Sequence, residues 1–90
     1  MTFLTYAQLP NVTKQWNAYT RRCRKNRASR DRDVKRAFAE RAAKALSEQA
    51  LDLRLRAAYA RWDEADAASW TRYSREWDEA LRRKKESTTS

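Results

Sequence analysis

The 90-residue sequence contains no glycine and no histidine, and it has a single proline and a single cysteine. Without glycine, the tight turns of β-hairpins and a glycine-rich phosphate loop are both disfavoured. Without histidine, the chain lacks the commonest general base and metal ligand, and Cys23 has no imidazole to activate it. We therefore expect no enzyme, no bound metal and no cofactor.

The cysteine content and the hydropathy pattern also bear on location. A lone cysteine forms no internal disulfide, which favours the cell interior. The sequence has no apolar run of about 18 residues, and its first residues lack the pattern of a signal peptide. We expect a cytoplasmic protein with no membrane partner.

The residues that are abundant favour helices. Alanine, leucine, arginine, lysine, glutamate and glutamine dominate the middle and the end of the chain, and all are good helix formers. Four tryptophans, four tyrosines and two phenylalanines supply the apolar surface that a disordered chain would lack. The sequence predicts an all-α fold, with one helical domain over residues 1–85 and a polar mobile tail over residues 86–90.

Helix signals divide the first third of the chain. Thr5 and Gln8 have the spacing of a capping box, which predicts a short helical turn before Pro10. A helix is expected from about residue 12 to about residue 28, with an apolar stripe of Val12, Trp16, Tyr19 and Cys23. The capping side chains between residues 29 and 33 then predict a turn.

A long third helix is expected from about Asp33 to Ala65, and its apolar stripe changes sides near residues 46–53. Two interpretations explain this shift. In one, Ser47 caps a new helix after a bend; in the other, one continuous helix is covered by different partners on its two halves. We favour the continuous helix, because neither glycine nor proline interrupts it.

A last helix is predicted from Ser69, after a break at residues 66–69, with a stripe of Trp70, Tyr73, Trp77 and Leu81. The expected architecture is a small antiparallel bundle of three main helices around the long central one. The helix before the central helix and the one after it would each cover one of its halves. A homodimer would bury the same stripes, so the oligomeric state stays open.

Residues 21–36 carry much of the positive charge of the chain. They hold nine lysines or arginines and two aspartates, against a net charge of +9 for the whole sequence. With a turn inside this segment, the cations would form one rigid corner, and such a patch attracts nucleic acid or an acidic protein surface. The candidate binding residues are Arg21, Arg22, Arg24, Lys25, Arg27, Arg30, Arg32, Lys35 and Arg36.

Two further groups of side chains are weaker candidates. A basic run near the end of the last helix complements the helix dipole and would be an auxiliary phosphate contact: Arg82, Arg83, Lys84 and Lys85. Three tryptophans could instead anchor a protein partner: Trp62, Trp70 and Trp77.

These patterns lead to two functional hypotheses. The first is a nucleic-acid-binding accessory or regulatory protein that contacts the phosphate backbone of DNA or RNA. The alternative is a protein-binding inhibitor or adaptor, of the kind encoded by mobile elements, that docks on a nucleic-acid-processing complex. The spacing matches neither a helix-turn-helix nor a basic leucine zipper.

Overall fold

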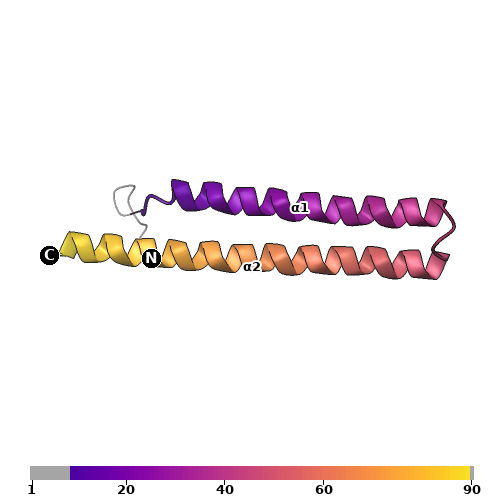
Figure 1. Ribbon diagram of the computed structural model, residues 1–90. Helices are drawn as coiled ribbons and strands as arrows, with labels where there is room; N and C mark the ends of the chain where they lie inside the picture. Colours follow the sequence, from indigo (N-terminus) through magenta and orange to yellow (C-terminus); the bar gives the residue numbers. More distant parts are fainter. Residues whose placement is uncertain (1–8, 90) are drawn as a thin grey trace.

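The computed structural model describes residues 9–89, with the side chains of residues 9–87. Helix α1 (Thr13–Ala42) and helix α2 (Glu48–Thr89) run antiparallel and are joined by residues 43–47 (Figure 1). No strand occurs within the described range, so the predicted all-α class is confirmed. The predicted bundle of three main helices is wrong, because the chain forms a hairpin of two helices.

The hairpin is long and thin. Its principal-axis extents are 67 × 23 × 17 Å, and its radius of gyration is 20.2 Å. A globular chain of 90 residues would have a radius of gyration of about 12 Å. Each helix is therefore covered by its neighbour along one side only, and most of its circumference meets solvent.

The turn expected at residues 29–33 does not exist, and α1 passes straight through this segment. Its polar side chains contact other side chains instead of capping a helix end. The guanidinium of Arg30 lies over the rings of Tyr59 and Trp62 on α2. Asp33 accepts a hydrogen bond from Arg61 of α2 at 3.2 Å. Contacts with α2 thus override the local capping preference.

The chain reverses at residues 43–47, where we expected a continuous helix. Lys44 has a left-handed backbone (φ 63°), and the N–H of Ala45 donates to the carbonyl of Glu40 at 2.8 Å. This is the geometry of a Schellman motif, which ends a helix. The Ser47 hydroxyl accepts a hydrogen bond from the N–H of Ala50 at 3.1 Å and starts α2. The interpretation with Ser47 as a cap was therefore the right one.

The break predicted at residues 66–69 is also absent. Asp66 and Ser69 lie inside α2 and face α1, where the Asn26 amide donates to the Asp66 carboxylate at 2.9 Å and reaches the Ser69 hydroxyl at 3.4 Å. The helix continues through residues 86–89, which we expected to form a tail. The mobility of that tail and the limits of the single domain stay predictions.

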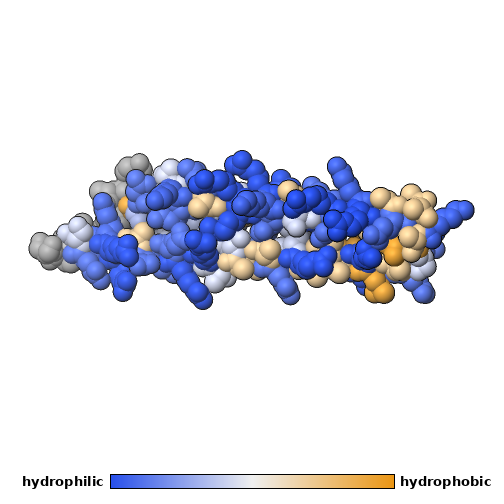
Figure 2. Space-filling model, viewed as in Figure 1, coloured by the Kyte–Doolittle hydropathy of each residue, from blue (hydrophilic) through white to orange (hydrophobic). Residues whose placement is uncertain are grey.

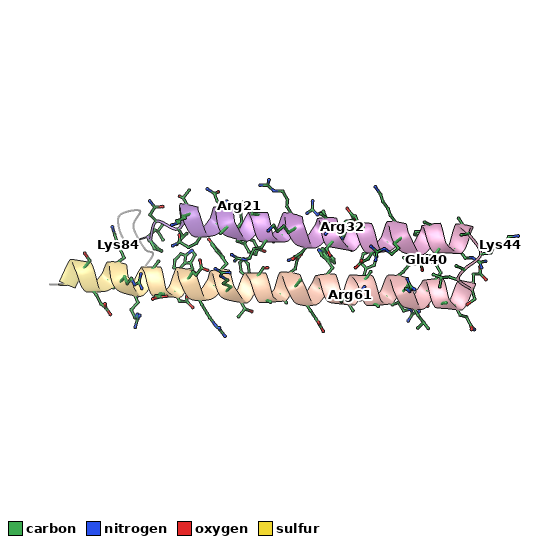
Figure 3. The ribbon with its side chains drawn as sticks, in the orientation of Figure 1. Arg21, Arg32, Glu40, Lys44, Arg61 and Lys84 are labelled. Atoms are coloured by element: carbon green, nitrogen blue, oxygen red, sulfur yellow. The ribbon has the colours of Figure 1, made fainter. Side chains whose placement is uncertain are left out.

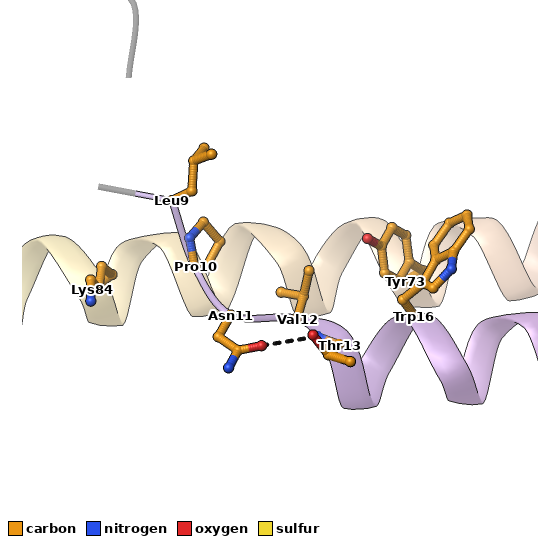
Figure 4. A pocket seen from close by; sticks show the side chains of 8 residues that line it. All are labelled: Leu9, Pro10, Asn11, Val12, Thr13, Trp16, Tyr73 and Lys84. Atoms are coloured by element: carbon orange, nitrogen blue, oxygen red, sulfur yellow. Dashed lines mark hydrogen bonds between the residues drawn. The ribbon is translucent and has the colours of Figure 1, made fainter. Parts of the chain in front are cut away.

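Helix α1 begins at Thr13, one residue later than predicted, with Val12 at the N-cap position. The Asn11 side-chain oxygen accepts a hydrogen bond from the N–H of Thr13 at 3.2 Å (Figure 4). Leu9 and Pro10 precede the helix without regular secondary structure and line an open pocket with Trp16, Tyr73 and Lys84. The helical turn predicted over residues 1–10 falls mostly outside the described residues.

The core between the helices is thin. Ala37, Ala58 and Tyr73 are its buried apolar residues, and the two alanines let the helix backbones approach closely. Near the start of α1, Trp16 and Tyr19 pack against Tyr73, with ring centroids 5.5 and 5.4 Å from it. This aromatic group replaces the interior that a third helix would have provided.

The visible surface reflects the charge content of the sequence. Figure 2 shows a face that is mostly hydrophilic along both helices, with apolar side chains gathered toward the connector. Neither helix, over the residues that the structure describes, has a stretch apolar and long enough to cross a membrane.

Candidate nucleic-acid interface

The net positive charge of the chain lies almost entirely on α1. This helix has 11 lysines or arginines and three acidic residues, a net charge of +8. Helix α2 has nine basic and nine acidic residues, and Lys44 in the connector supplies the remaining charge. The hairpin is therefore electrostatically asymmetric, with one strongly basic helix beside a neutral one.

Most of the predicted binding residues lie on the solvent side of α1. Seven of the nine are exposed: Arg21, Arg24, Lys25, Arg27, Arg32, Lys35 and Arg36. Figure 3 shows Arg21 and Arg32 along α1, whereas Glu40 lies between the helices. Because no turn interrupts α1, these cations form an elongated stripe rather than the compact corner that we expected.

The stripe runs along one side of the helix. At 100° per residue, and with buried Ala37 marking the side that faces α2, Arg21, Arg24, Arg32 and Lys35 fall within about 40° of the opposite direction. Lys14 falls in the same range and extends the stripe toward the start of α1. From residue 14 to residue 36 the stripe covers about 33 Å at 1.5 Å per residue. Lys14 lies outside residues 21–36, the segment from which the candidate residues were chosen.

Two predicted binding residues face α2 instead. Arg22 is half-buried and donates to the backbone carbonyl of Ser69 at 3.3 Å. Arg30 places its guanidinium carbon 4.5 Å from the ring centroid of Trp62 and pairs with Asp31 at 3.1 Å. Both arginines hold the two helices together, so the structure separates them from the solvent-facing set.

The acidic residues of α1 do not neutralise the stripe. All three form ion pairs with other arginines: Asp31 with Arg30 at 3.1 Å, Asp33 with Arg61 at 3.2 Å, and Glu40 with Arg54 at 2.8 Å. Within residues 9–89, no salt bridge involves any of the seven exposed cations of the predicted set. Their charge therefore faces solvent without an internal counterion.

The auxiliary basic run and the candidate docking tryptophans lie apart from the stripe, on α2. The four cations at residues 82–85 are exposed, and Arg83 pairs with Glu79 at 2.6 Å. Of the tryptophans, Trp70 is largely exposed, whereas Trp62 and Trp77 are half-buried against the hairpin. The structure does not gather these groups into one site with the α1 cations.

Cys23 and Tyr19 are the remaining side chains with reactive groups, and they lie next to each other in the hairpin. Cys23 is free and half-buried beside Tyr19. A hydrogen bond with Cys23, followed by burial, raises the pKa of the Tyr19 phenol above its usual value. Among the described residues, no group of three potential metal-ligating side chains comes together.

Comparison of the chain with known protein families, with curated proteins and with solved structures finds no match. The functional argument therefore rests on the residues and the geometry of the hairpin.

Proposed function

We propose that this protein binds the phosphate backbone of nucleic acid through the solvent-facing side of α1 and acts as an accessory or regulatory factor. The observation that carries the proposal is the row of exposed cations on α1, which have no ion pair within the described part of the chain. Such concentrated positive charge binds a polyanion favourably, because binding releases the counterions condensed on the polyanion.

The shape of the stripe suits an extended partner. Its length of about 33 Å is close to one helical turn of duplex DNA, which rises about 34 Å. Five of the seven exposed cations are arginines, whose planar guanidinium groups match phosphate oxygens in pairs. A straight helix laid against a curved duplex reaches only part of the backbone, so we expect about four simultaneous phosphate contacts.

The stripe offers little for reading a base sequence. Base readout also uses asparagine, glutamine and apolar contacts at fixed positions, and on the solvent-facing side of α1 Asn17 is the one amide beside the lysines and arginines. We therefore expect backbone binding with weak sequence preference. We keep the cell interior as the expected compartment, on the basis of the single free cysteine.

Binding can be tested by fluorescence anisotropy with labelled duplex DNA and single-stranded RNA over a salt series. With about four contacts, the log-log slope on duplex DNA would be about −3.6, so affinity would fall about 150-fold between about 50 and about 200 mM salt. Replacing Arg21, Arg24 and Arg32 by alanine should reduce the magnitude of the log-log salt slope to about 1.

A variant of equal net charge provides the control. Arg56, Arg72 and Arg75 are exposed arginines of α2, and their replacement by alanine leaves +6, the same charge as the α1 variant. The control should keep most of the wild-type slope. Equal losses in both variants would show that only the total charge matters. Absence of binding even at low salt would contradict the proposal and favour an acidic protein partner.

A further inference from the structure

One flank of the hairpin is aromatic. Phe38 follows buried Ala37, Tyr59 follows buried Ala58, and Trp70 follows buried Ser69. One step along a right-handed helix turns 100°, and in an antiparallel pair the same step on both helices leads to the same side of the pair. Phe38 on α1 and the two aromatic residues on α2 therefore share one flank. 

Trp16 lies on this aromatic flank as well. It borders an open groove together with Trp70, Tyr73 and Trp77. The exposed fractions are 52% for Phe38, 48% for Tyr59, 52% for Trp70 and 46% for Trp16. These side chains form two exposed apolar groups along the flank, Phe38 with Tyr59 toward the connector and Trp16 with Trp70 toward the other end. Exposed apolar patches on a protein surface are typical of interaction sites.

The opposite flank has a different character. The ion pairs Glu40–Arg54 and Asp33–Arg61 cross between the helices there. Each of these four residues is three positions after or four positions before a buried alanine, which places it on that flank. The polar flank is thus closed by contacts within the hairpin. On the aromatic flank Arg30 lies over Tyr59 and Tyr19 contacts Trp70, but the Tyr59 and Trp70 side chains remain about half exposed.

The solvent-accessible surface of the hairpin is large enough to bind a protein partner. The accessible surface of the chain is 7534 Å², whereas a compact monomer of 10.7 kDa would expose about 5,500 Å². A typical stable interface removes about 800 Å² from each partner. The surplus of about 2,000 Å² is therefore large enough for such an interface.

We propose that the aromatic flank packs against the aromatic flank of a second copy of this chain, which gives a four-helix dimer. Two flanks can face each other in two symmetric ways. With the two-fold axis along the hairpin, α1 lies over the partner's α2 and both connectors are at the same end. With the axis across the hairpin, α1 lies over the partner's α1.

Charge selects the first arrangement. Two α1 helices face to face would oppose net charges of +8 and +8, whereas α2 is neutral. Arg27 is an exposed α1 cation on the aromatic side, and the Asn26–Asp66 hydrogen bond sets its level along α2. At that level α2 presents Asp63 on the same flank. In the first arrangement Arg27 therefore faces the acidic side of the partner's α2.

Sedimentation equilibrium over a concentration series measures the association. The wild type should have twice the chain mass at tens of micromolar, and Phe38→Gln or Tyr59→Gln should weaken association at least tenfold. Leu53→Gln is the matched control, because Leu53 is 67% exposed on the outer side of α2, away from the flank. A wild type that stays monomeric at all concentrations, or a control that dissociates as much as the flank variants, would overturn the proposal.

The arrangement has its own test, which leaves the aromatic residues intact. A nitroxide label on Ala45→Cys, in a Cys23→Ala background, reports the distance between the two connectors. Connectors at the same end should give a distance below about 25 Å, because only two helix diameters separate them. A distance above about 40 Å, close to the length of α1, would refute the proposed pairing.

Discussion

Replacing Arg30 by alanine should destabilise the hairpin, although Arg30 belongs to the most basic segment of the chain. Its guanidinium carbon lies 5.4 Å from the ring centroid of Tyr59 and 4.5 Å from that of Trp62. The side chain is only 18% exposed, so its methylene groups also cover the rings. Removal of Arg30 therefore takes away packing between α1 and α2 as well as charge.

The loss can be estimated from these contacts. A cation–π contact contributes about 0.5–1 kcal/mol at an exposed site and about 2 kcal/mol when desolvated. With two rings in contact and little exposure, Arg30→Ala should lower the free energy of unfolding by about 1.5–2 kcal/mol. Arg30→Lys keeps the charge but loses the planar stacking, so we expect about half of that loss.

Urea unfolding followed by circular dichroism measures this difference, at one fixed protein concentration because dimerisation would also stabilise the fold. Arg32→Ala is the control: it removes the same side chain two residues later, from the solvent side of α1. The control should change the free energy of unfolding by less than about 0.5 kcal/mol. If Arg30→Ala and Arg32→Ala behave alike, the inward position of Arg30 is wrong.

Three further predictions concern the connector and the aromatic group. Ser47→Ala should lower the free energy of unfolding by about 1 kcal/mol, because the N–H of Ala50 loses its acceptor; an unchanged urea midpoint would argue against this cap. Lys44→Gly should raise the urea midpoint, by about 0.5–1 kcal/mol in stability, because glycine adopts the positive φ without strain; a lower midpoint would contradict the turn geometry. The pKa of Tyr19 is raised, first by the hydrogen bond with Cys23, so the protonated phenol stabilises the fold below the unfolded-state pKa of 10.0. This contribution is lost as pH rises through the folded-state pKa. The stability of the wild type relative to Tyr19→Phe should therefore fall above about pH 10, and a pH-independent difference would contradict the shift.

The sequence predicted the helical class and the stripe of Trp16 and Tyr19, because both follow from composition and periodicity within one helix. It also indicated a change near residue 47, where the apolar stripe shifts sides. The absence of glycine led us to favour a continuous helix. Lys44 adopts the left-handed conformation that glycine usually supplies, and no local pattern revealed this.

The two predicted breaks that do not exist have a common physical cause. Residues such as Asp33 and Asp66 favour helix ends when they have no other partner. In the hairpin, Asp33 pairs with Arg61, and Asp66 accepts a hydrogen bond from Asn26, both across the helix pair. These partners are 28 and 40 positions away in sequence, so local propensity could not reveal them.

The sequence predicted which segment holds the candidate site, but not which of its side chains face solvent. Charge counting located residues 21–36, and most of their cations are exposed. The arginines that face inward are those on the side of α1 that packs against α2. The sequence did not indicate that side once a turn was assumed at residues 29–33. Arg22 and Arg30 therefore moved from the binding set to the helix interface.

The most direct test of nucleic-acid binding by α1 is an NMR titration of the arginine Nε–Hε signals of the full chain with a short DNA duplex. We expect the signals of Arg21, Arg24 and Arg32 to shift, and those of Arg22 and Arg30 to change little because they contact α2. Shifts confined to the arginines of α2, or no shifts at low salt, would contradict the account.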